Sequence, residues 1–525
     1  MWKWSLAIVL ITFGIYGNTI NSSFLWDDQQ FVLENQFLTS WHKLPLVFTN
    51  NIAAGAGIIS NLYRPLQSVT HFFDIQVWGY WSPGHHLTNV ILACIAAALL
   101  FQFLLSLVLL VDLKAKVAAF FITLLYVAHP LQSEIIGYVS GRGDSLAFIF
   151  LLVAGINFRT RFWLAAIATV LGILSKESGL LIPPFLLVYD FFTSSSKSEM
   201  KSRWYKHLLL WILVGIYLGL RFTVLNFHSF TNFYGQENIL TQNHSYRIFT
   251  YFASFAKGLQ IWIWPTDLHH ERNWMISSHW YEWLTVCGAL LWTSMLGAAA
   301  WLWKKAPLIS FGCLWFIGAT IPTSNLLIII NALFYDHWFV LPGLGFCFIL
   351  LHFYQAFLAQ KKWSRGIQAV LILSLSCLLG VEIWATQIQN RIWKNPQSLF
   401  EHILKYNPGS TKMMNNLAME LSQQGKNQEA KELYLRAIKT SDEYPQTHHN
   451  LALIYISEQN FSEALNELKK AIQLDEGFYQ SWTYTGLIQL HQNKLNEAAA
   501  SFRKSLEIHP TAQAQKGLEQ ALKPH

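Results

Sequence analysis

The sequence predicts an all-α protein in which a polytopic transmembrane helical core of about 11 spans is followed by an α-solenoid of short helical repeats. Of its 525 residues, 53% are hydrophobic and only 13% are charged, whereas soluble domains carry about 25% charged residues. The deficit is confined to residues 1–390, which hold long apolar runs, while residues 391–525 have the composition of a soluble protein. We therefore expect one domain in lipid and a second in water.

Apolar runs near the length needed to cross about 30 Å of hydrocarbon define the predicted spans. We expect the first run to be an uncleaved signal-anchor, because no small-x-small cleavage site follows it. Residues 247–266 carry Lys257 in mid-run and two tryptophans, so we expect this segment to lie on the outer surface or to be re-entrant. The runs fall at residues 2–20, 87–111, 116–130, 143–158, 162–175, 179–192, 207–225, 281–303, 307–329, 334–358 and 366–388.

Basic residues gather in five of the turns between these runs. Lysine and arginine favour the cytoplasmic side of a membrane, so we expect the N-terminus inside and the C-terminus outside. The long segment 21–86 is then external. The five clusters are Lys114 and Lys116; Arg159 and Arg161; Lys197, Lys201, Arg203 and Lys206; Lys304 and Lys305; and Lys361, Lys362 and Arg365.

Charge and cysteine usage disfavour two other classes of protein. The net charge of +7 does not indicate nucleic-acid binding, because the basic residues lie in short loops between apolar runs. All five cysteines lie inside apolar stretches without a CxxC pair, so we expect neither a disulfide framework nor a zinc site. The spacings HxxH and HExxH are also absent, which disfavours metal-dependent hydrolysis.

The C-terminal domain carries a 34-residue period. Small residues recur at two positions of each period and a large apolar residue at a third, a pattern typical of the tetratricopeptide repeat. Repeats are expected near 411–444, 445–478 and 479–512, and three of them suffice to bury a shared core. The recurring sets are Ala418, Ala452 and Gly486; Ala430, Ala464 and Ala498; and Tyr434, Leu468 and Phe502.

Two adjacent carboxylates, Asp27 and Asp28, follow the first span in the stretch FLWDDQQFVLEN. Repulsion between like charges raises the pKa of one partner, which suits that carboxylate to act as a general base. The alternative is a structural role, as a helix N-cap or a solvated pair at the membrane surface. The pair is the first candidate for a catalytic group.

Further clusters of ionisable residues lie at the outer ends of the spans. Such groups are costly at membrane depth and indicate function, unless they are internal ion pairs, such as Lys176 with Glu134 or Asp144. Arg64 ends a polar loop and suits a phosphate, because its planar fork donates two hydrogen bonds, although a snorkelling arginine fits equally well. The other members are His129, Arg142, Glu177, Asp336 and His337.

These motifs, taken in order, resemble a known family. The chain contains WDD, YRPL, HP…E…GRGD, LSKESG, YDHWFVLPGLGF and QNRIWKNPQSLF ahead of its repeats. The acidic pair in the first external loop resembles the polyprenyl-phosphate-sugar-dependent glycosyltransferases of the C superfamily. The whole set is similar to the transmembrane-and-tetratricopeptide O-mannosyltransferases and their bacterial relatives, over nearly the entire chain.

The resemblance implies an inverting transfer of one sugar, with mannose as the candidate, from a polyprenyl-phosphate carrier to a protein Ser or Thr hydroxyl on the non-cytoplasmic face. It implies Asp27 or Asp28 as the base. It implies Arg64, Arg142 and Lys176 as the groups that hold the carrier phosphate. The repeats would bind the acceptor protein, and no nucleic acid would be involved.

Other residues are given supporting roles by the same resemblance. Eukaryotic members more often show an acidic–Arg pair where this chain has Asp336 and His337, which indicates a bacterial source. The protein is then expected in the bacterial inner membrane, or in the endoplasmic reticulum membrane if its source is eukaryotic. We expect no cofactor and no metal ligand, although Asp27 and Asp28 together leave a divalent ion open. The supporting residues are His129, Glu134, Asp144, Glu177, Asp336 and His337.

Two other functions compete with the transferase. A transporter for a lipid-linked saccharide would place its site near the bilayer midplane and show repeated halves, whereas the charged clusters here lie at span ends. A non-catalytic membrane scaffold would use only the peptide-binding groove of the repeats, and the repeat pattern alone is compatible with it.

Overall fold

A computed structural model describes residues 2–108, 113–194, 196–225, 240, 243–270, 272, 276–330, 332–359 and 365–523. Within those ranges every regular element is a helix, in agreement with the predicted all-α class. The chain divides into two compact units, Met1–Asn395 and Pro396–His525.

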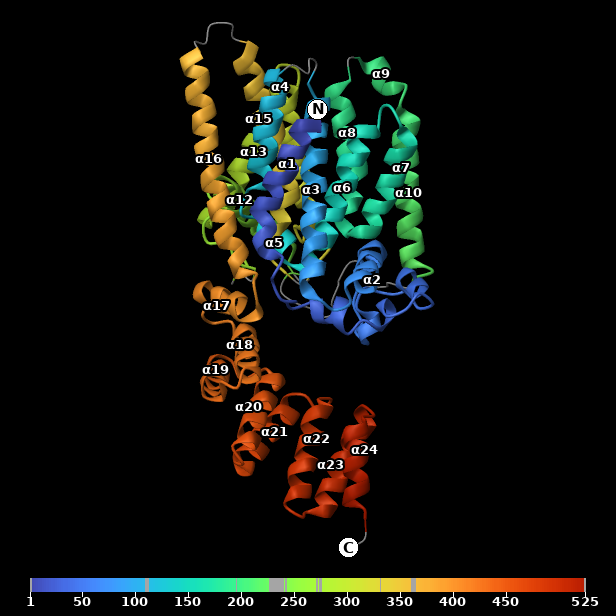
Figure 1. The fold of residues 1–525 in the computed structure, drawn as a ribbon, viewed down its shortest axis with the longest axis vertical. Helices are drawn as coiled ribbons and strands as arrows, with labels where there is room; N and C mark the ends of the chain where they lie inside the picture. The colour runs from blue at the N-terminus through green and yellow to red at the C-terminus, as the bar shows by residue number, and fades with distance from the viewer. Residues whose placement is uncertain are drawn as a thin grey trace. The chain divides into compact units, whose positions relative to one another are not determined.

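Each predicted apolar run overlaps one helix of the first unit, and these helices form the bundle of Figure 1. A helix satisfies its backbone hydrogen bonds within its own segment, which lipid requires. The helices are α1 (Trp2–Tyr16), α3 (Ser82–Ser106), α4 (Leu113–Val127), α6 (Arg142–Asn157), α7 (Phe162–Ser175), α8 (Ile182–Thr193), α10 (Trp204–Phe222), α13 (Trp283–Leu302), α14 (Pro307–Thr320), α15 (Val340–Ala359) and α16 (Arg365–Ile392).

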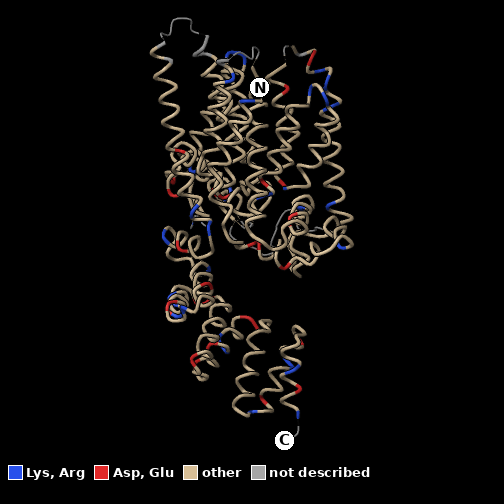
Figure 2. The backbone as a smooth tube through the Cα atoms, in the orientation of Figure 1, with Lys and Arg blue, Asp and Glu red and all other residues tan. Residues whose placement is uncertain are grey.

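Six of the described helices are long and apolar enough to cross a membrane, and three shorter apolar helices cover further predicted spans. Charged residues are accordingly sparse in the middle of the bundle and frequent near its ends (Figure 2). The first unit is therefore that of a multi-pass membrane protein. The total of 11 spans stays a prediction, because α1 and α8 belong to neither group. The segment 247–266 forms α12 (His244–Ile263), which is not among the six.

Aromatic side chains fill the centre of this unit. Phe311 of α14 stacks on Phe348 of α15 with ring centroids 4.3 Å apart, and Phe185 of α8 lies against both rings. Glycine lets the two helices approach each other closely, because a Cβ on Gly345 would lie 2.4 Å from the carbonyl oxygen of Gly312. Small residues serve the same purpose wherever membrane helices pack backbone to backbone.

At the bundle end predicted to be cytoplasmic, the buried carboxylate of Asp190 gathers several basic residues. Arg203 lies 2.7 Å from it, Arg159 lies 3.3 Å away and the ring of His207 lies 3.1 Å away. Part of the charge that predicted the orientation therefore also ties α8 to α10. Lys361, Lys362 and the side chains of Lys114, Lys197 and Arg365 lie outside the described residues.

The segment between α1 and α2 (Pro65–Trp78) folds into short helical turns: η2 (Gln29–Leu33), η3 (Gln36–Leu38), η4 (Leu44–Phe48) and η5 (Ala54–Ala56). Phe31 and Val32 pack against Ile52 and Val139 in a small core. Asn35 bridges two turns by donating to the carbonyl of Ile52 at 2.9 Å. The segment between α1 and α2 is thereby fastened to the connection that leads into α6, and this fixes the place of the acidic pair.

The second unit consists of helical hairpins that coincide with the predicted repeats. Ala418, Ala452 and Ala464 are fully buried, and a Cβ on Gly486 would lie 2.9 Å from the ring of Phe502. The predicted small positions are therefore the contacts between paired helices. The helices are α17 (Pro396–Tyr406), α18 (Thr411–Gln423), α19 (Asn427–Thr440), α20 (Pro445–Ser457), α21 (Phe461–Leu474), α22 (Tyr479–His491), α23 (Leu495–Ile508) and α24 (Ala512–Ala521).

Candidate active site

The acidic pair lies in a tight turn after the first helix. Trp26 has φ of 44°, a left-handed backbone that is uncommon for a bulky residue and often marks a functional site. The N–H of Asp28 donates to the carbonyl of Leu25 at 2.8 Å and closes the turn. The two carboxylates then enter different surroundings, since Asp28 is fully buried and Asp27 is half-buried.

Asp28 is held entirely by the protein. One carboxylate oxygen accepts from the N–H of Leu25 at 2.8 Å, and the other accepts from the N–H and the hydroxyl of Ser140 at 2.8 and 2.5 Å. Burial raises the pKa of Asp28 to about 7, and repulsion by Asp27, the cause expected from the sequence, contributes less. Asp28 is therefore a positioning residue that fastens the turn to Ser140.

The raised pKa of Asp28 predicts a pH-dependent stability. Unfolded, this group titrates near 3.8, and in the folded chain near 7, so the folded state binds the proton more tightly between those values. Its contribution to the free energy of unfolding is fully present below about pH 4 and is lost as the pH rises through about 7. We expect the thermal midpoint in detergent to fall across this window more steeply in the wild type than in Asp28→Asn. Equal slopes would contradict the assignment.

Asp27 is the member of the pair that reaches an open side. Its backbone N–H donates to the Tyr138 hydroxyl at 2.9 Å, and the Tyr138 ring stacks on Trp393 with centroids 5.7 Å apart. The neighbouring Trp26 sets its ring edge-on to His270, 5.0 Å between centroids. Aromatic groups thus hold the backbone of Asp27 in place, and Tyr138 also interacts with its side chain, while the residue as a whole stays partly exposed.

Arg64 and Lys176 are each bound to a carboxylate. The guanidinium of Arg64 lies 2.9 Å from Glu177, and the ammonium of Lys176 lies 2.5 Å from Asp144. Burial tends to lower the pKa of Arg64, but nearby carboxylates raise it, Glu177 first. Asp144 and Asp27 contribute to the same rise, so these charges share one neighbourhood with the acidic pair. The ion pair of Lys176 with Asp144 is the structural alternative that the sequence left open.

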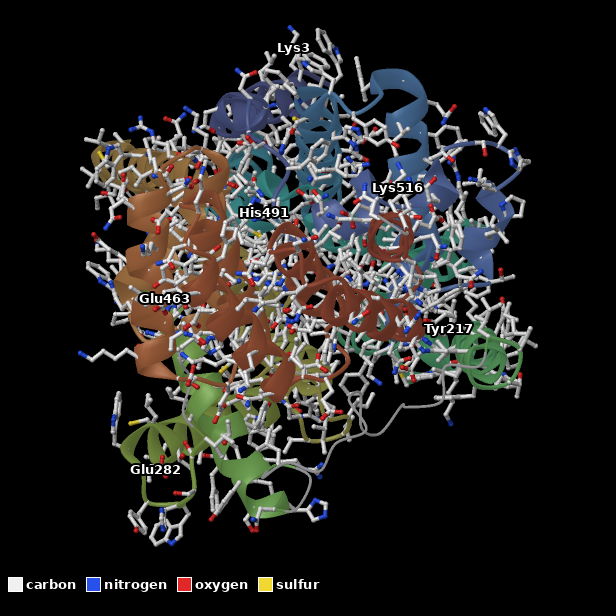
Figure 3. All side chains as sticks on the ribbon, turned by 90° about the horizontal axis from the view of Figure 1, so that it is seen from below. Lys3, Tyr217, Glu282, Glu463, His491 and Lys516 are labelled. Atoms are coloured by element: carbon white, nitrogen blue, oxygen red, sulfur yellow. The ribbon has the colours of Figure 1, made fainter. Side chains whose placement is uncertain are left out.

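Arg221, in the last turn of α10, joins this neighbourhood and was not predicted. It donates to the carbonyl of Asn61 at 2.6 Å and to the hydroxyl of Tyr217, labelled in Figure 3, at 3.0 Å. Burial would raise the pKa of Glu177, but the charges of Arg64 and then Arg221 lower it. The signal was present in the sequence, because an arginine within an apolar run is costly and marks a site.

Arg142 does not face an open site, which corrects the phosphate-binding role implied for it. Its side chain is fully enclosed, and its guanidinium donates to Asp74 at 2.5 Å, to Asn89 at 2.8 Å and to the carbonyl of His85 at 3.0 Å. A third nitrogen donates to Thr70 at 3.4 Å. A buried guanidinium needs such partners for its N–H groups, and none of its edges is left to meet a carrier phosphate.

Glu134, on α5 (Gln132–Gly137), joins two histidines. The Nδ1 atoms of His270 and His337 each lie 2.6 Å from the same oxygen of Glu134. Burial would raise the pKa of this carboxyl, but the two imidazoles outweigh it and hold the pKa well below its usual range. The sequence did not single out His270, although the stretch DLHHER after α12 holds two histidines between acidic residues.

The adjacent residues Asp336 and His337 have separate partners. Asp336, in η9 (Asp336–Phe339), binds the guanidinium of Arg272 at 2.6 Å. The aspartate therefore forms an acidic–Arg pair with a residue distant in sequence, although its neighbour in sequence is a histidine. His129 lies elsewhere: its ring stacks on Trp262 with centroids 4.2 Å apart and contacts the Trp262 carbonyl at 3.2 Å. His129, between α4 and α5, therefore packs against α12.

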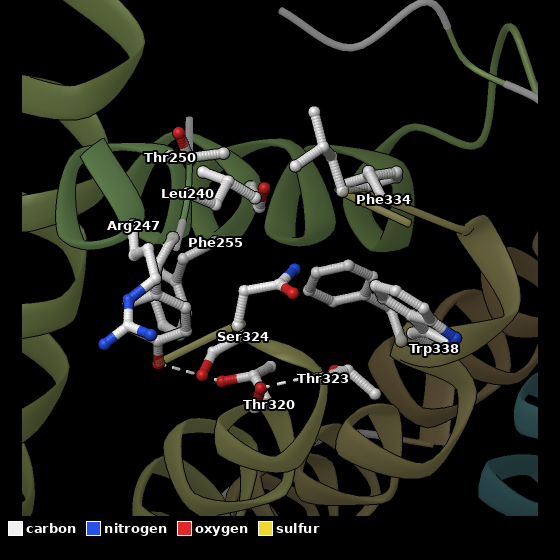
Figure 4. Close-up of a pocket in the computed structure, with 14 residues that line it drawn as sticks. Leu240, Arg247, Thr250, Phe255, Thr320, Thr323, Ser324, Phe334 and Trp338 are labelled. Carbon is white, nitrogen blue, oxygen red and sulfur yellow. Dashed lines mark hydrogen bonds between the residues drawn. The ribbon is translucent and has the colours of Figure 1, made fainter. Parts of the chain in front are cut away.

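A separate small pocket lies beside η9 (Figure 4). Its lining mixes aromatic rings, such as Phe334 and Trp338, with hydroxyl groups. The hydroxyls of Tyr251 and Thr320 are hydrogen-bonded at 3.0 Å. Pockets with apolar walls and a few convergent polar groups are typical ligand sites. None of the site residues predicted from the sequence lines this pocket.

Family models for the tetratricopeptide repeat match residues 449–513 and 411–441. Among curated proteins, a protein O-mannosyl-transferase of Caenorhabditis elegans is 24% identical over 454 residues, covering 84% of this chain and 63% of its own length. The protein O-mannosyl-transferase TMTC1 of Homo sapiens is 23% identical over 506 residues, covering 84% of this chain and 55% of its own length. The chain thus spans about 55–63% of the length of these two relatives.

Among solved structures, ArnT from Cupriavidus metallidurans bound to undecaprenyl phosphate is 11% identical, with a TM-score of 0.40, and the match covers 91% of this chain and 80% of that one. The relatives carry the name that the sequence motifs predicted, and the repeat models match the expected end of the chain. The chain is a membrane protein similar in sequence to protein O-mannosyl-transferases such as TMTC1, with tetratricopeptide repeats at its C-terminal end.

Proposed function

We propose that this chain is a membrane glycosyltransferase that moves one sugar, with mannose as the candidate, from a polyprenyl-phosphate carrier to a Ser or Thr hydroxyl of a protein. The observation that carries the proposal is a half-buried carboxylate, Asp27, in one neighbourhood with Arg64. A base and a cation in one neighbourhood are what transfer from a phosphate leaving group needs. The names of the relatives supply the class of acceptor.

Asp27 acts as the general base in the proposed reaction. Its carboxylate takes the proton of the acceptor hydroxyl while the hydroxyl oxygen forms a bond to the anomeric carbon of the sugar. The bond from that carbon to the phosphate oxygen breaks, and its electron pair leaves with the carrier phosphate. Attack from the face opposite the leaving group inverts the anomeric centre. Asp28 takes no proton from the acceptor, because its oxygens are occupied by Leu25 and Ser140.

Cationic side chains meet the charge of the leaving phosphate. Arg64 and Lys176 now form ion pairs with Glu177 and Asp144. We propose that both cations leave these carboxylates to bind oxygens of the carrier phosphate. Arg221 is proposed to join them, since its charge acts on the same carboxylate as that of Arg64. A guanidinium fork binds phosphate through two parallel hydrogen bonds. Charge stabilisation of this kind is the largest single contribution in many enzymes, and the step uses no cofactor.

The repeat unit is proposed to hold the acceptor polypeptide. Stacked helical hairpins form extended concave surfaces that bind peptides, and this arrangement would raise the local concentration of acceptor hydroxyls. The reaction is assigned to the non-cytoplasmic face of the membrane, a bacterial inner membrane in the first instance. That assignment rests on the basic turns, which are expected to be cytoplasmic.

Membranes that contain the full chain test the proposal directly. Incubation with radiolabelled polyprenyl-phosphate mannose is expected to label protein, and mild alkali is expected to release the label, as it does for sugars linked to Ser or Thr. Membranes without the chain serve as the control. Absence of protein label with every lipid-linked donor would exclude the transferase and favour the transporter or the scaffold.

A further inference from the structure

Three side chains from distant parts of the sequence converge beside the acidic pair. Glu134 lies on α5, His270 follows α12, and His337 lies in η9. The carboxylate oxygen and the two ring nitrogens all lie within 4.8 Å of one another. Both Nδ1 atoms lie 2.6 Å from the same carboxylate oxygen, and that of His270 is hydrogen-bonded to it, whereas the buried Nδ1 of His337 has no hydrogen-bond partner within the part of the chain that the structure describes. The fold has therefore brought two imidazoles and one carboxylate to a single point.

This set of donors has a well-defined chemistry. Two histidine nitrogens and one carboxylate oxygen are ligands that zinc accepts, and sites with three protein ligands keep a fourth position open. In a tetrahedral site with bonds of about 2.0 Å, neighbouring ligand atoms lie about 3.3 Å apart. The present contacts of 2.6 Å would each widen by about 0.7 Å to admit the ion, a change that side-chain rotation can supply.

The surroundings fix the ring of His270. It packs face to face with Tyr335, with centroids 4.9 Å apart, and edge-on to Trp26 and Trp393 at 5.0 and 5.7 Å. The rings of His270 and His337 are nearly parallel, with 10° between their planes. Neighbours that orient imidazole ligands are a regular feature of metal sites, because they determine which ring nitrogen faces the ion.

A second cluster of possible metal ligands is less suited to a cation. His71, Asp74 and His85 also lie close together and are buried, but the carboxylate of Asp74 already binds the guanidinium of Arg142 at 2.5 Å. A cation placed there would meet a fixed positive charge. No Lys or Arg contact to Glu134 occurs among the described residues, whose recorded ion pairs with it are to the two histidines.

We propose that Glu134, His270 and His337 bind one divalent cation of the zinc class. The ion would join α5, the segment after α12 and η9 into one rigid edge. Because Trp26 packs on His270, that edge also supports the turn that carries Asp27. The cation is a new property of this chain, since the sequence predicted no metal ligand, and it does not depend on which sugar or acceptor the chain uses.

Metal analysis of the purified full-length chain tests the site. Wild-type protein grown with zinc is expected to hold one ion per chain by mass spectrometry of the elements. The variants Glu134→Gln and His270→Gln are expected to bind it at least about 10- to 100-fold more weakly. His279→Gln is the matched control, because His279 lies in the same connection with 57% of its side chain exposed. Equal metal in all four proteins, or none in the wild type, would overturn the proposal.

A measurement on the wild type alone guards against variants that fail to fold. Metal-stripped protein titrated with Co²⁺ is expected to give the intense visible absorption of a four-coordinate ion, saturating at one equivalent and displaced by zinc. A weak six-coordinate spectrum, or no saturation, would overturn the site. Neither experiment measures sugar transfer, so the metal site and the proposed transferase are tested separately.

Discussion

Asp27→Asn is expected to abolish sugar transfer to protein and to leave folding intact. A positioned general base contributes about 10²- to 10⁴-fold to a rate, so the variant should lose at least about 100-fold. An amide has nearly the same shape as a carboxylate but does not accept the proton. The backbone contact of Asp27 with Tyr138 uses its N–H and survives the change. Label transfer and the thermal midpoint, measured on the same membranes or purified protein, check both parts.

The neighbouring acid provides the matched control. Asp28→Asn places an amide NH₂ against backbone N–H donors, where Leu25 and Ser140 now point. A buried donor without an acceptor costs about 1–3 kcal/mol, so this variant should melt earlier than Asp27→Asn. Full transfer activity in Asp27→Asn would remove Asp27 as the base. A lower midpoint for Asp27→Asn than for Asp28→Asn would reverse the two roles.

Arg142→Met is expected to destabilise the protein by about 3–5 kcal/mol, because it leaves the buried carboxylate of Asp74 without its cation. The guanidinium is completely enclosed and contacts that carboxylate at 2.5 Å. Removing both charges in the double variant Arg142→Met/Asp74→Leu should recover much of the loss. Unfolding followed in detergent, with the exposed Arg161→Met as control, measures the effect.

The outcome also decides between two roles for this arginine. A phosphate-binding residue would lose activity while the midpoint of unfolding stayed near that of the wild type. A structural residue would lower the midpoint, and the double variant would raise it again. An unchanged midpoint in Arg142→Met would therefore return Arg142 to the group that holds the donor.

The fold was largely predictable, because both of its signals are local. An apolar segment long enough to cross a membrane must form a helix, because lipid offers no partners for its backbone hydrogen bonds. Each of the predicted apolar runs overlaps a helix. The 34-residue period places small residues such as Ala452 at helix contacts in the same way. Helix ends were less predictable: the run 307–329 ends as α14 at Thr320, because apolarity alone carries no signal for the end of a helix.

The candidate site was predictable in composition but not in pairing. Glu134 was expected with neighbours in sequence, and the structure pairs it with His270 and His337, more than a hundred residues away along the chain. Arg142 and Arg64 look alike in sequence, since each ends a polar stretch before a helix. Burial separates them, and burial is a property of tertiary packing that no local motif records.

The left-handed backbone of Trp26 has a consequence for how the segment after α1 can change in length. The turn gives two chemically identical acids different surroundings. Which acid is buried therefore depends on how many residues separate it from Trp26 along the chain. An insertion or deletion of one residue there would exchange the buried and the open place.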